Sequence, residues 1–525
     1  MSRAQAWERL REPYDLLVIG GGITGAATLY EAARRGLRAA LVERGDFASG
    51  TSSRSSKLVH GGLRYLKEGK LGLTRESVRE REELLRDAPG LVEPVAFVMP
   101  HYRKRKPSRA TLALGLALYD ALAGTRRHGY LDAEQTLALV PALDPDALTG
   151  AHWYLDGTTD DARLVLRLLA EAEAAGAVAL NYASAALLYG DDARVCGAAV
   201  TAPQGERVEV RARATISATG VFADELRAGL GAAPRLRPLR GSHLVLPAWR
   251  LPLARCIAFE HPHDGRPVFA YPWEGAVLAG TTDLDHDAPL DAEPAISPQE
   301  TAYLVAALRF AFPSLRLDAQ DALCAYAGIR PIADRHAADP SKASRDHLVW
   351  NERGLVTISG GKLTTFRPMA MDALAAAAPL LPPFERAARR VFERSPLPQG
   401  ALRTAAQRRL AGRYGALAQQ VVDAAAPGEL ACVEGTTTLW AELRWAARHE
   451  MVRHLDDLLL RRTRVGLLVA RGGERHFGRV AEICEQELGW PAARWSQELD
   501  AYRERVACNY AVPDRARIPD FRGYL

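Results

Sequence analysis

Cysteine is scarce in this sequence, and its distribution excludes several kinds of site. Six cysteines are spread over 525 residues. No two of them form C-x-x-C, and no cluster of cysteine and histidine has the spacing of metal ligands. The pattern therefore predicts no metal site and is typical of free thiols in a reducing compartment.

Long apolar runs and a strong charge imbalance are also missing. No stretch of about 20 residues is uninterruptedly apolar, so no membrane-spanning helix is expected. The N-terminal residues lack the apolar core of a signal peptide. The formal net charge is only +5, which does not indicate a nucleic-acid partner. These features predict a cytoplasmic protein, and the length predicts two or three domains.

What the sequence does contain is a glycine-rich turn near its N-terminus. An apolar run, Leu16–Ile19, leads into Gly20, Gly22 and Gly25, which have the spacing G-x-G-x-x-G. A helical segment and a second apolar run follow, and this second run ends at Glu43. The order strand, turn, helix, strand and acid is typical of a dinucleotide-binding unit, with the pyrophosphate at the helix N-terminus and the acid on the ribose. The unit alone does not distinguish NAD from FAD.

Hydroxyl groups and glycines are concentrated between residues 46 and 66. One interpretation is a flexible loop. The other is a lining of donors for phosphates and ring polar atoms, in which Gly61 and Gly62 let the backbone approach a flat ligand.

This segment also carries a resemblance to a known family. The sequence resembles the FAD-dependent glycerol-3-phosphate dehydrogenases over nearly its whole length. The matching motifs are Ile19–Gly25, Thr51–Leu66, Asp160–Val165, Arg240–His243, Gly280–Asp283, Gly328–Pro331 and Gly360–Thr365. The resemblance implies that the dinucleotide is FAD, bound without any metal.

The motifs and the resemblance together predict the residues that bind this cofactor. Gly360–Thr365 is a second glycine turn opening a helix, whose N-terminus can face the isoalloxazine. The predicted cofactor-binding residues are Gly20, Gly21, Gly22, Ile23, Thr24, Gly25, Glu43, Thr51, Ser52, Ser53, Ser56, Lys57, His60, Gly61, Gly62, Leu63, Gly220, Gly360, Gly361, Lys362, Leu363 and Thr364.

The resemblance implies the oxidation of sn-glycerol 3-phosphate to dihydroxyacetone phosphate, with a hydride leaving C2 for the flavin. Phosphate binding favours arginine, whose planar fork grips two oxygens, and Arg330 is the first choice. A base must accept the hydroxyl proton, and the intrinsic pKa of histidine suits this task. His243 is the predicted base, with His60 and Lys362 as alternatives. The predicted catalytic residues are His243, Arg330 and Lys362, and the predicted substrate-binding residues are His60, Arg64, Tyr65, His243, Arg330 and Arg345.

The strongest run of basic residues, His101–Arg109, precedes the mostly apolar segment Ala110–Leu122. A solvated loop followed by a core helix would have this pattern. A basic cluster beside an apolar helix can also lie on an anionic membrane surface. Composition alone favours the first interpretation. The resemblance implies a membrane quinone as electron acceptor and a peripheral location on the inner face of the plasma membrane, which leaves the two interpretations of this segment equally open.

The predicted fold class is α/β, with a Rossmann-like FAD-binding domain, an inserted and mainly antiparallel β substrate domain, and a C-terminal all-helical cap domain. The first two domains interleave within residues 1–390. The predicted FAD-binding parts are 12–72, 150–230 and 345–380, the substrate parts are 73–149 and 231–344, and the helical domain is 400–525. Within the helical domain, the run Arg461–Arg464 is interpreted as a solvated or phosphate-neutral face.

Other functions remain open at this point. The same half-reaction with oxygen as acceptor would make the protein a glycerophosphate oxidase. An amine or amino-acid oxidase, or a non-enzymatic flavin-binding or RNA-modifying partner, is a more distant alternative. A homodimer is also left open. Arg54 departs from the family motif, which has a small residue there, and the sequence does not say whether it faces the cofactor phosphates.

Overall fold

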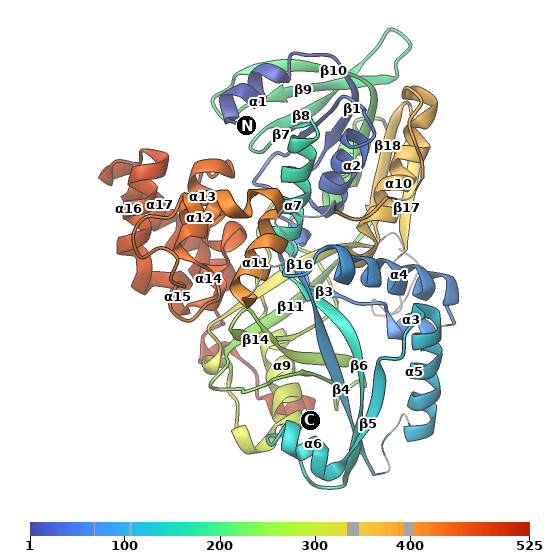
Figure 1. Ribbon diagram of the computed structural model, residues 1–525, viewed down its shortest axis with the longest axis vertical. Helices are drawn as coiled ribbons and strands as arrows, with labels where there is room; N and C mark the ends of the chain where they lie inside the picture. The colour runs from blue at the N-terminus through green and yellow to red at the C-terminus, as the bar shows by residue number, and fades with distance from the viewer. Residues whose placement is uncertain (68, 104, 106–107, 333–345, 388, 393–403) are drawn as a thin grey trace.

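The computed structural model describes residues 1–525 except 68, 104, 106–107, 333–345, 388 and 393–403, and the side chains of Arg64 and Lys67 are also outside the description. Two β-sheet domains lie one above the other, and a helical domain packs beside them (Figure 1). The predicted fold class is therefore confirmed.

The upper domain is built on an eight-stranded sheet with β1 near its centre (Figure 1). β1 pairs in parallel with β2 and β10, and β10 pairs in parallel with β18. The path runs β17-β18-β10-β1-β2-β7, with β9 also paired to β10 and β8 to β9. The strands are β1 (Tyr14–Ile19), β2 (Ala39–Val42), β7 (Val178–Leu180), β8 (Ser184–Tyr189), β9 (Val195–Thr201), β10 (Arg207–Ser217), β17 (His347–Glu352) and β18 (Leu355–Gly360).

Both faces of this sheet are covered, as its apolar strands predict. Leu16 and Val18 of β1 contribute to a core shared with α2 (Ile23–Ala33), α7 (Asp161–Ala174) and α10 (Phe366–Ala377). The alternate residues Leu17 and Ile19 face a second core with α1 (Arg3–Arg9). A short helix, α8 (Ala223–Ala228), follows β10.

The lower domain is a ten-stranded sheet in which every pair is antiparallel except β4 with β12. The path runs β15-β11-β14-β13-β12-β4-β6-β3, with β16 paired to β11 and β5 to β6. The strands are β3 (Leu58–Val59), β4 (Val92–Tyr102), β5 (His128–Asp132), β6 (Leu148–Thr159), β11 (Arg237–Pro247), β12 (Cys256–Glu260), β13 (Pro267–Trp273), β14 (Ala276–Gly280), β15 (Leu284–Asp285) and β16 (Cys324–Ile332). Its helices are α3 (Leu63–Lys67), α4 (Leu71–Asp87), α5 (Arg109–Ala123), α6 (Ala133–Leu139) and α9 (Pro298–Ala311).

Two predicted domain boundaries differ from this arrangement. The boundary at 150 falls inside β6, which pairs with β4 along most of its length and so belongs wholly to the lower sheet. β3, within the predicted FAD-binding part 12–72, also pairs with β6. Pairing between strands that are distant in the sequence decides to which domain a strand belongs. The local sequence pattern does not reveal this pairing.

Between Ala405 and Tyr510 the named elements are all helices, joined by turns and by an isolated bridge between Cys432 and Leu439. Its α-helices are α11 (Ala405–Tyr414), α12 (Ala418–Asp423), α13 (Trp440–His449), α14 (Val465–Leu468), α15 (Ala470–Gly473), α16 (Phe477–Leu488) and α17 (Ala492–Arg505). The chain then leaves this domain, because Val512, Ile518 and Phe521 pack against a core of the lower domain. The C-terminus accordingly lies beside α9 (Figure 1).

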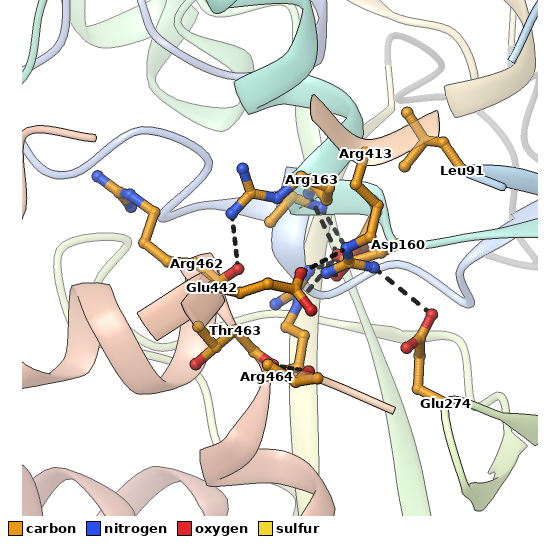
Figure 2. A network of polar contacts seen from close by, with 12 residues as sticks. Leu91, Asp160, Arg163, Glu274, Arg413, Glu442, Arg462, Thr463 and Arg464 are labelled. Atoms are coloured by element: carbon orange, nitrogen blue, oxygen red, sulfur yellow. Dashed lines mark hydrogen bonds and ion pairs between the residues drawn. The ribbon is translucent and has the colours of Figure 1, made fainter. Parts of the chain in front are cut away.

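Buried ion pairs join the helical domain to the upper domain. Asp160, the N-cap of α7, accepts hydrogen bonds from Arg413 and Arg464, both at 2.9 Å (Figure 2). Burial alone would raise the pKa of Asp160, but these arginines hold it far below its usual range. Arg462 forms two hydrogen bonds of 2.6 and 2.7 Å with Asp46 of the upper domain. The interpretation of Arg461–Arg464 as a solvated face was therefore wrong, since all four residues are buried.

Candidate active site

A cavity of about 3370 Å³ is lined by residues of both β-sheet domains. Sites for drug-sized ligands occupy about 300–1,000 Å³, so this cavity has room for an extended dinucleotide and a small substrate. Its polar lining comes mainly from loops at strand ends, where predicted site residues converge.

The first glycine turn lines the cavity. Gly20 has a φ of +114°, and a Cβ on Gly25 would lie 1.8 Å from the carbonyl oxygen of Gly20. Helix α2 therefore packs directly on the turn. Its N-cap, Gly22, has no side chain to cap the helix, and the backbone N–H of Ile23 donates to Ser52 Oγ at 2.9 Å. The helix N-terminus and Ser52 both line the cavity. Glu43 accepts hydrogen bonds from the backbone N–H groups of Gly21 and Gly45, both at 2.7 Å, which fixes its carboxylate beside the turn.

The second glycine turn approaches the same cavity from β18. Gly360 and Gly361 have φ of +83° and +76°, and a Cβ on Gly361 would lie 2.4 Å from the sulfur of Met369. A helical turn begins directly afterwards, and its N-cap Lys362 makes no side-chain cap bond. Two helical N-termini thus face one cavity.

Most of the predicted cofactor-binding residues line this cavity. Those that do are Gly20, Gly22, Ile23, Thr24, Glu43, Thr51, Ser52, Ser56, His60, Gly62, Leu63, Gly220, Gly360, Gly361, Lys362, Leu363 and Thr364. Two glycine turns and a hydroxyl-rich loop on one cavity suit a flat ligand with phosphates, and these residues fit FAD.

Five predicted cofactor residues do not line the cavity, and each has another role. Gly21 and Gly25 shape the first turn from behind. Gly61 packs on helix α5, because a Cβ there would lie 2.3 Å from the hydroxyl of Tyr119. Ser53 is buried, and its carbonyl oxygen accepts from Lys57 at 2.8 Å.

Among these five residues, Lys57 differs most clearly from its predicted role in cofactor binding. Its ammonium group also donates to Asp161 Oδ1 at 2.9 Å, and both side chains are fully buried. Burial lowers the pKa of Lys57 to about 8. Lys57 therefore anchors the hydroxyl-rich loop to helix α7 instead of reaching a ligand. The Ser-Ser-Lys sequence did not reveal this, because the partner Asp161 is distant along the chain.

Arg330 of β16 lies on the cavity wall. Its Nη1 donates to Asp283 Oδ1 at 2.9 Å, and its Nη2 donates to Thr281 Oγ1 at 3.1 Å. Gly241 on the neighbouring strand β11 leaves room for the guanidinium, since a Cβ there would lie 2.3 Å from Nη2. The side chain keeps 23% of its surface exposed, so this fixed planar group can bind an anion.

His243 lies one side chain away from the cavity. Its Nε2 is 2.8 Å from Ser56 Oγ, and Ser56 lines the cavity while His243 does not. The imidazole stacks on Tyr326, with 4.9 Å between ring centroids, and its Nδ1 has no hydrogen-bond partner among the described residues. Burial, and then the charges of Arg330 and Lys57, lower the pKa of His243 well below its ordinary value. The neutral imidazole can therefore act on the cavity only through Ser56.

The two alternative bases lie on the cavity wall itself. Lys362 Nζ is 3.6 Å from the ring centroid of Tyr65 and 3.2 Å from Ser77 Oγ. His60 also lines the cavity, and its carbonyl oxygen accepts a hydrogen bond from Thr364. The side chain of Arg64 and the whole of Arg345 fall outside the described residues.

Three cavity residues were missed or left undecided by sequence reasoning. Asp283 holds Arg330, and its place in the Gly280–Asp283 motif was the available signal. Arg266 lies on the same wall with no motif around it. Arg54 donates to Glu293 and, at 3.1 Å, to the hydroxyl of Tyr510. Arg54 therefore ties the hydroxyl-rich loop to the end of the helical domain.

Comparisons with known proteins agree with this geometry. The family described as "FAD dependent oxidoreductase" matches residues 15–367, and "C-terminal domain of alpha-glycerophosphate oxidase" matches residues 357–495. An aerobic glycerol-3-phosphate dehydrogenase of Staphylococcus epidermidis is 39% identical over 367 residues, which are 68% of this chain and 66% of that protein. The match thus spans slightly less than two thirds of this relative's length.

Solved structures extend the similarity to nearly the whole chain. The glycerol-3-phosphate dehydrogenase of Bacillus halodurans, solved with FAD, has a TM-score of 0.76 and 29% identity over 97% of both chains. An L-α-glycerophosphate oxidase of Mycoplasma pneumoniae has a TM-score of 0.57 and 20% identity over 70% of this chain and 95% of its own, a similarity of fold alone.

Proposed function

The chain belongs to the FAD-dependent oxidoreductase family, and on this basis we propose that it oxidises sn-glycerol 3-phosphate to dihydroxyacetone phosphate. The observation that carries the proposal is Arg330, fixed by Asp283 and Thr281 on the wall of the cavity that both glycine turns enter. The names of the similar dehydrogenases support the same substrate.

Each part of the cavity has a task in this reaction. The N-terminus of α2 would hold the cofactor pyrophosphate, and the turn at Gly360 would hold the isoalloxazine. When bound, FAD supplies the acceptor for the hydride that leaves C2. Arg330 holds the substrate phosphate and so orients C2 for hydride transfer. The free energy of phosphate binding thereby places the reacting atoms in the geometry that the reaction needs. Arg64 and Arg345 remain predicted phosphate ligands.

The proton of the C2 hydroxyl has a proposed route through Ser56 to His243. Neutral His243 can accept a hydrogen bond at Nε2, which directs the Ser56 oxygen toward the cavity. Arg330 is one cause of the low pKa of His243. A phosphate dianion on Arg330 offsets that charge and raises the proton affinity of the imidazole when substrate is bound. His60 and Lys362, which line the cavity, are the competing acceptors.

The proposal of peripheral membrane attachment rests on helix α5, which lies at the outer edge of the lower domain (Figure 1). Leu114 and Leu118 lie one helical turn apart and expose 74% and 44% of their surface. Both also line the cavity. Arg109 is the first residue of the helix, and Arg105 precedes it by four residues. An apolar, basic-flanked helix that also lines the cavity would let a lipid-soluble quinone reach the cavity from the membrane. Across the described residues, no helix is both long and apolar enough to span a bilayer.

Oxygen as the electron acceptor is the second candidate, because residues 357–495 match the C-terminal domain of α-glycerophosphate oxidase. Parallel assays of quinone reduction and of oxygen consumption distinguish the two candidate electron acceptors. Cytoplasmic location and a homodimer stay predictions.

The proposed function is tested by the visible spectrum of the purified protein without oxygen. A flavin spectrum that bleaches on addition of sn-glycerol 3-phosphate supports both cofactor and substrate. A flavin that bleaches with amino acids and not with glycerol 3-phosphate contradicts the proposal.

A further inference from the structure

Arg266 shares the carboxylate of Asp283 with Arg330. Its Nη2 lies 3.3 Å from Asp283 Oδ2, and its Nη1 donates to the Asp283 carbonyl oxygen at 3.2 Å. Arg330 occupies the other carboxylate oxygen, at 2.9 Å. Two guanidinium groups therefore flank one buried carboxylate, and all three residues line the cavity.

The turn that carries Arg266 is fixed in place. It closes the hairpin between β12 and β13, and the Arg266 carbonyl oxygen accepts from the backbone N–H of His261 at 2.7 Å. His261 is buried and stacks on Tyr303 of α9 with 3.6 Å between centroids, and its Nε2 lies 2.9 Å from the Tyr303 carbonyl oxygen. The Tyr303 hydroxyl in turn contacts Asp264 at 3.0 Å. A turn held from two sides can position an arginine with little loss of entropy on binding.

The Asp283 side of the cluster is equally well supported. Thr282 donates to Glu300 Oε1 at 2.7 Å and accepts from the backbone N–H of Ser242 at 2.8 Å. Glu300 is balanced by Arg240, whose Nη2 lies 3.0 Å away. The backbone at Asp283 is thus anchored to both β11 and α9.

Arg266 keeps N–H donors for the cavity beyond those that hold it to Asp283. A guanidinium has five N–H donors, and Arg266 directs Nη1 and Nη2 at the carbonyl and carboxylate oxygens of Asp283. Its side chain keeps 21% of its surface exposed, and it lies on the cavity wall beside Arg330. The remaining donors of Arg266 can therefore serve an anionic ligand in the cavity.

We propose that Arg266 is a second substrate-binding arginine, which holds the phosphate of the substrate together with Arg330. Asp283 contacts both guanidiniums, one at each carboxylate oxygen, and so holds them on the same wall of the cavity. This inference rests on the proposed function, because it names the site for the phosphate of that substrate.

The test compares Arg266→Gln and Arg266→Lys with the matched control Arg255→Gln. Arg255 immediately precedes β12, is exposed, and donates only to the carbonyl oxygen of Ala254. We expect Arg266→Gln to raise the KM for sn-glycerol 3-phosphate about tenfold with kcat within about twofold, because a charge-assisted bond to the phosphate is lost. Arg266→Lys should recover part of the loss. Oxidation of glycerol, which has no phosphate, should be unchanged in all three variants.

Calorimetric titration of each FAD-loaded variant with inorganic phosphate provides a readout independent of turnover. Weaker phosphate binding in Arg266→Gln alone supports the proposal, even if sn-glycerol 3-phosphate proves not to be the substrate. Unchanged phosphate binding and unchanged KM, in an enzyme that does oxidise glycerol 3-phosphate, overturns the role of Arg266 and leaves the proposed function intact. An equal loss on glycerol and on glycerol 3-phosphate also overturns it, since Arg266 would then only support the fold.

Discussion

Lys57 Nζ lies 2.9 Å from Asp161 Oδ1, and neither side chain is exposed. Asp161 also pairs with Arg464 of the helical domain. One carboxylate at the start of α7 therefore holds the hydroxyl-rich loop of the cavity and the helical domain together. The loop that lines the cavity is thus positioned by residues that lie outside the cavity lining.

The low pKa of Lys57 predicts a specific dependence of stability on pH. Its pKa is about 8 in the folded protein against an ordinary 10.5. Between these values the unfolded chain binds more protons than the folded one, so the contribution of Lys57 to the free energy of unfolding rises with pH. We expect wild type to gain stability over Lys57→Met as the pH is raised from 8 to 10.5. Urea unfolding at several pH values measures this difference, and a constant difference contradicts the assignment.

The first glycine turn predicts a loss of cofactor on a minimal substitution. A Cβ at Gly25 would lie 1.8 Å from the Gly20 carbonyl oxygen, so Gly25→Ala must displace the turn or the helix, at a cost of about 1–3 kcal/mol or more. We expect purified Gly25→Ala to have a lower ratio of flavin to protein absorbance. Gly478→Ala in α16, where a Cβ meets nothing within 4 Å, is the control. Equal ratios would show that the turn does not hold FAD.

Arg330→Ala should separate substrate binding from cofactor binding. Loss of a charge-assisted, two-oxygen contact is expected to raise the KM for sn-glycerol 3-phosphate by about 10²-fold. The FAD content should stay near that of wild type, because Arg330 is fixed by Asp283 and Thr281 and not by the glycine turns. Steady-state kinetics and the flavin spectrum measure both quantities. An unchanged KM rejects Arg330 as a phosphate ligand.

Ser56 and His243 should behave as one unit if protons follow the proposed route. We expect Ser56→Ala and His243→Ala each to slow flavin reduction by about 10²-fold or more, the range of general-base effects. The double variant should be no slower than the slower single variant. Stopped-flow reduction without oxygen gives these rates. If His60→Gln slows reduction and His243→Ala does not, His60 is the base.

Helix α5 should determine binding to lipid. Leu114→Glu with Leu118→Glu replaces two exposed apolar residues by negative charges, which an anionic surface repels. We expect this variant to lose sedimentation with vesicles that contain anionic lipid. Trp249→Glu is the control, because Trp249 is 80% exposed and lies outside the cavity lining. Equal loss in both variants, or none in either, contradicts the assignment of α5.

Local signals in the sequence were sufficient to predict the glycine turns that line the cavity. The positions of Gly20, Gly25 and Gly360 follow from backbone requirements that only glycine meets in these turns. The order of elements around them is also local. The family and FAD, inferred from motifs, are confirmed by the family match.

The sequence was less informative wherever two distant segments meet. Arg461 and Arg462 have the composition of a solvated surface, yet they are buried against Asp46. Lys57 lies within a ligand-binding motif, yet it points to Asp161. His243 was predicted to be the base that acts on the substrate, yet it lies behind Ser56. A charged side chain is recognised as buried only when its partner is known, and the partner is supplied by the fold.

The sequence by itself determined the parts of this protein that depend on consecutive residues: the glycine turns, the helices that start from them, the apolar strands and the FAD-dependent family. Only the tertiary structure decided which charges are paired, which loop residues face the cavity, and that Arg266 joins Arg330 at Asp283. The physical reason is the distance along the chain over which each interaction acts. Backbone conformation is fixed by neighbours in the chain, whereas the energy of a charge depends on burial and on partners that folding brings from elsewhere.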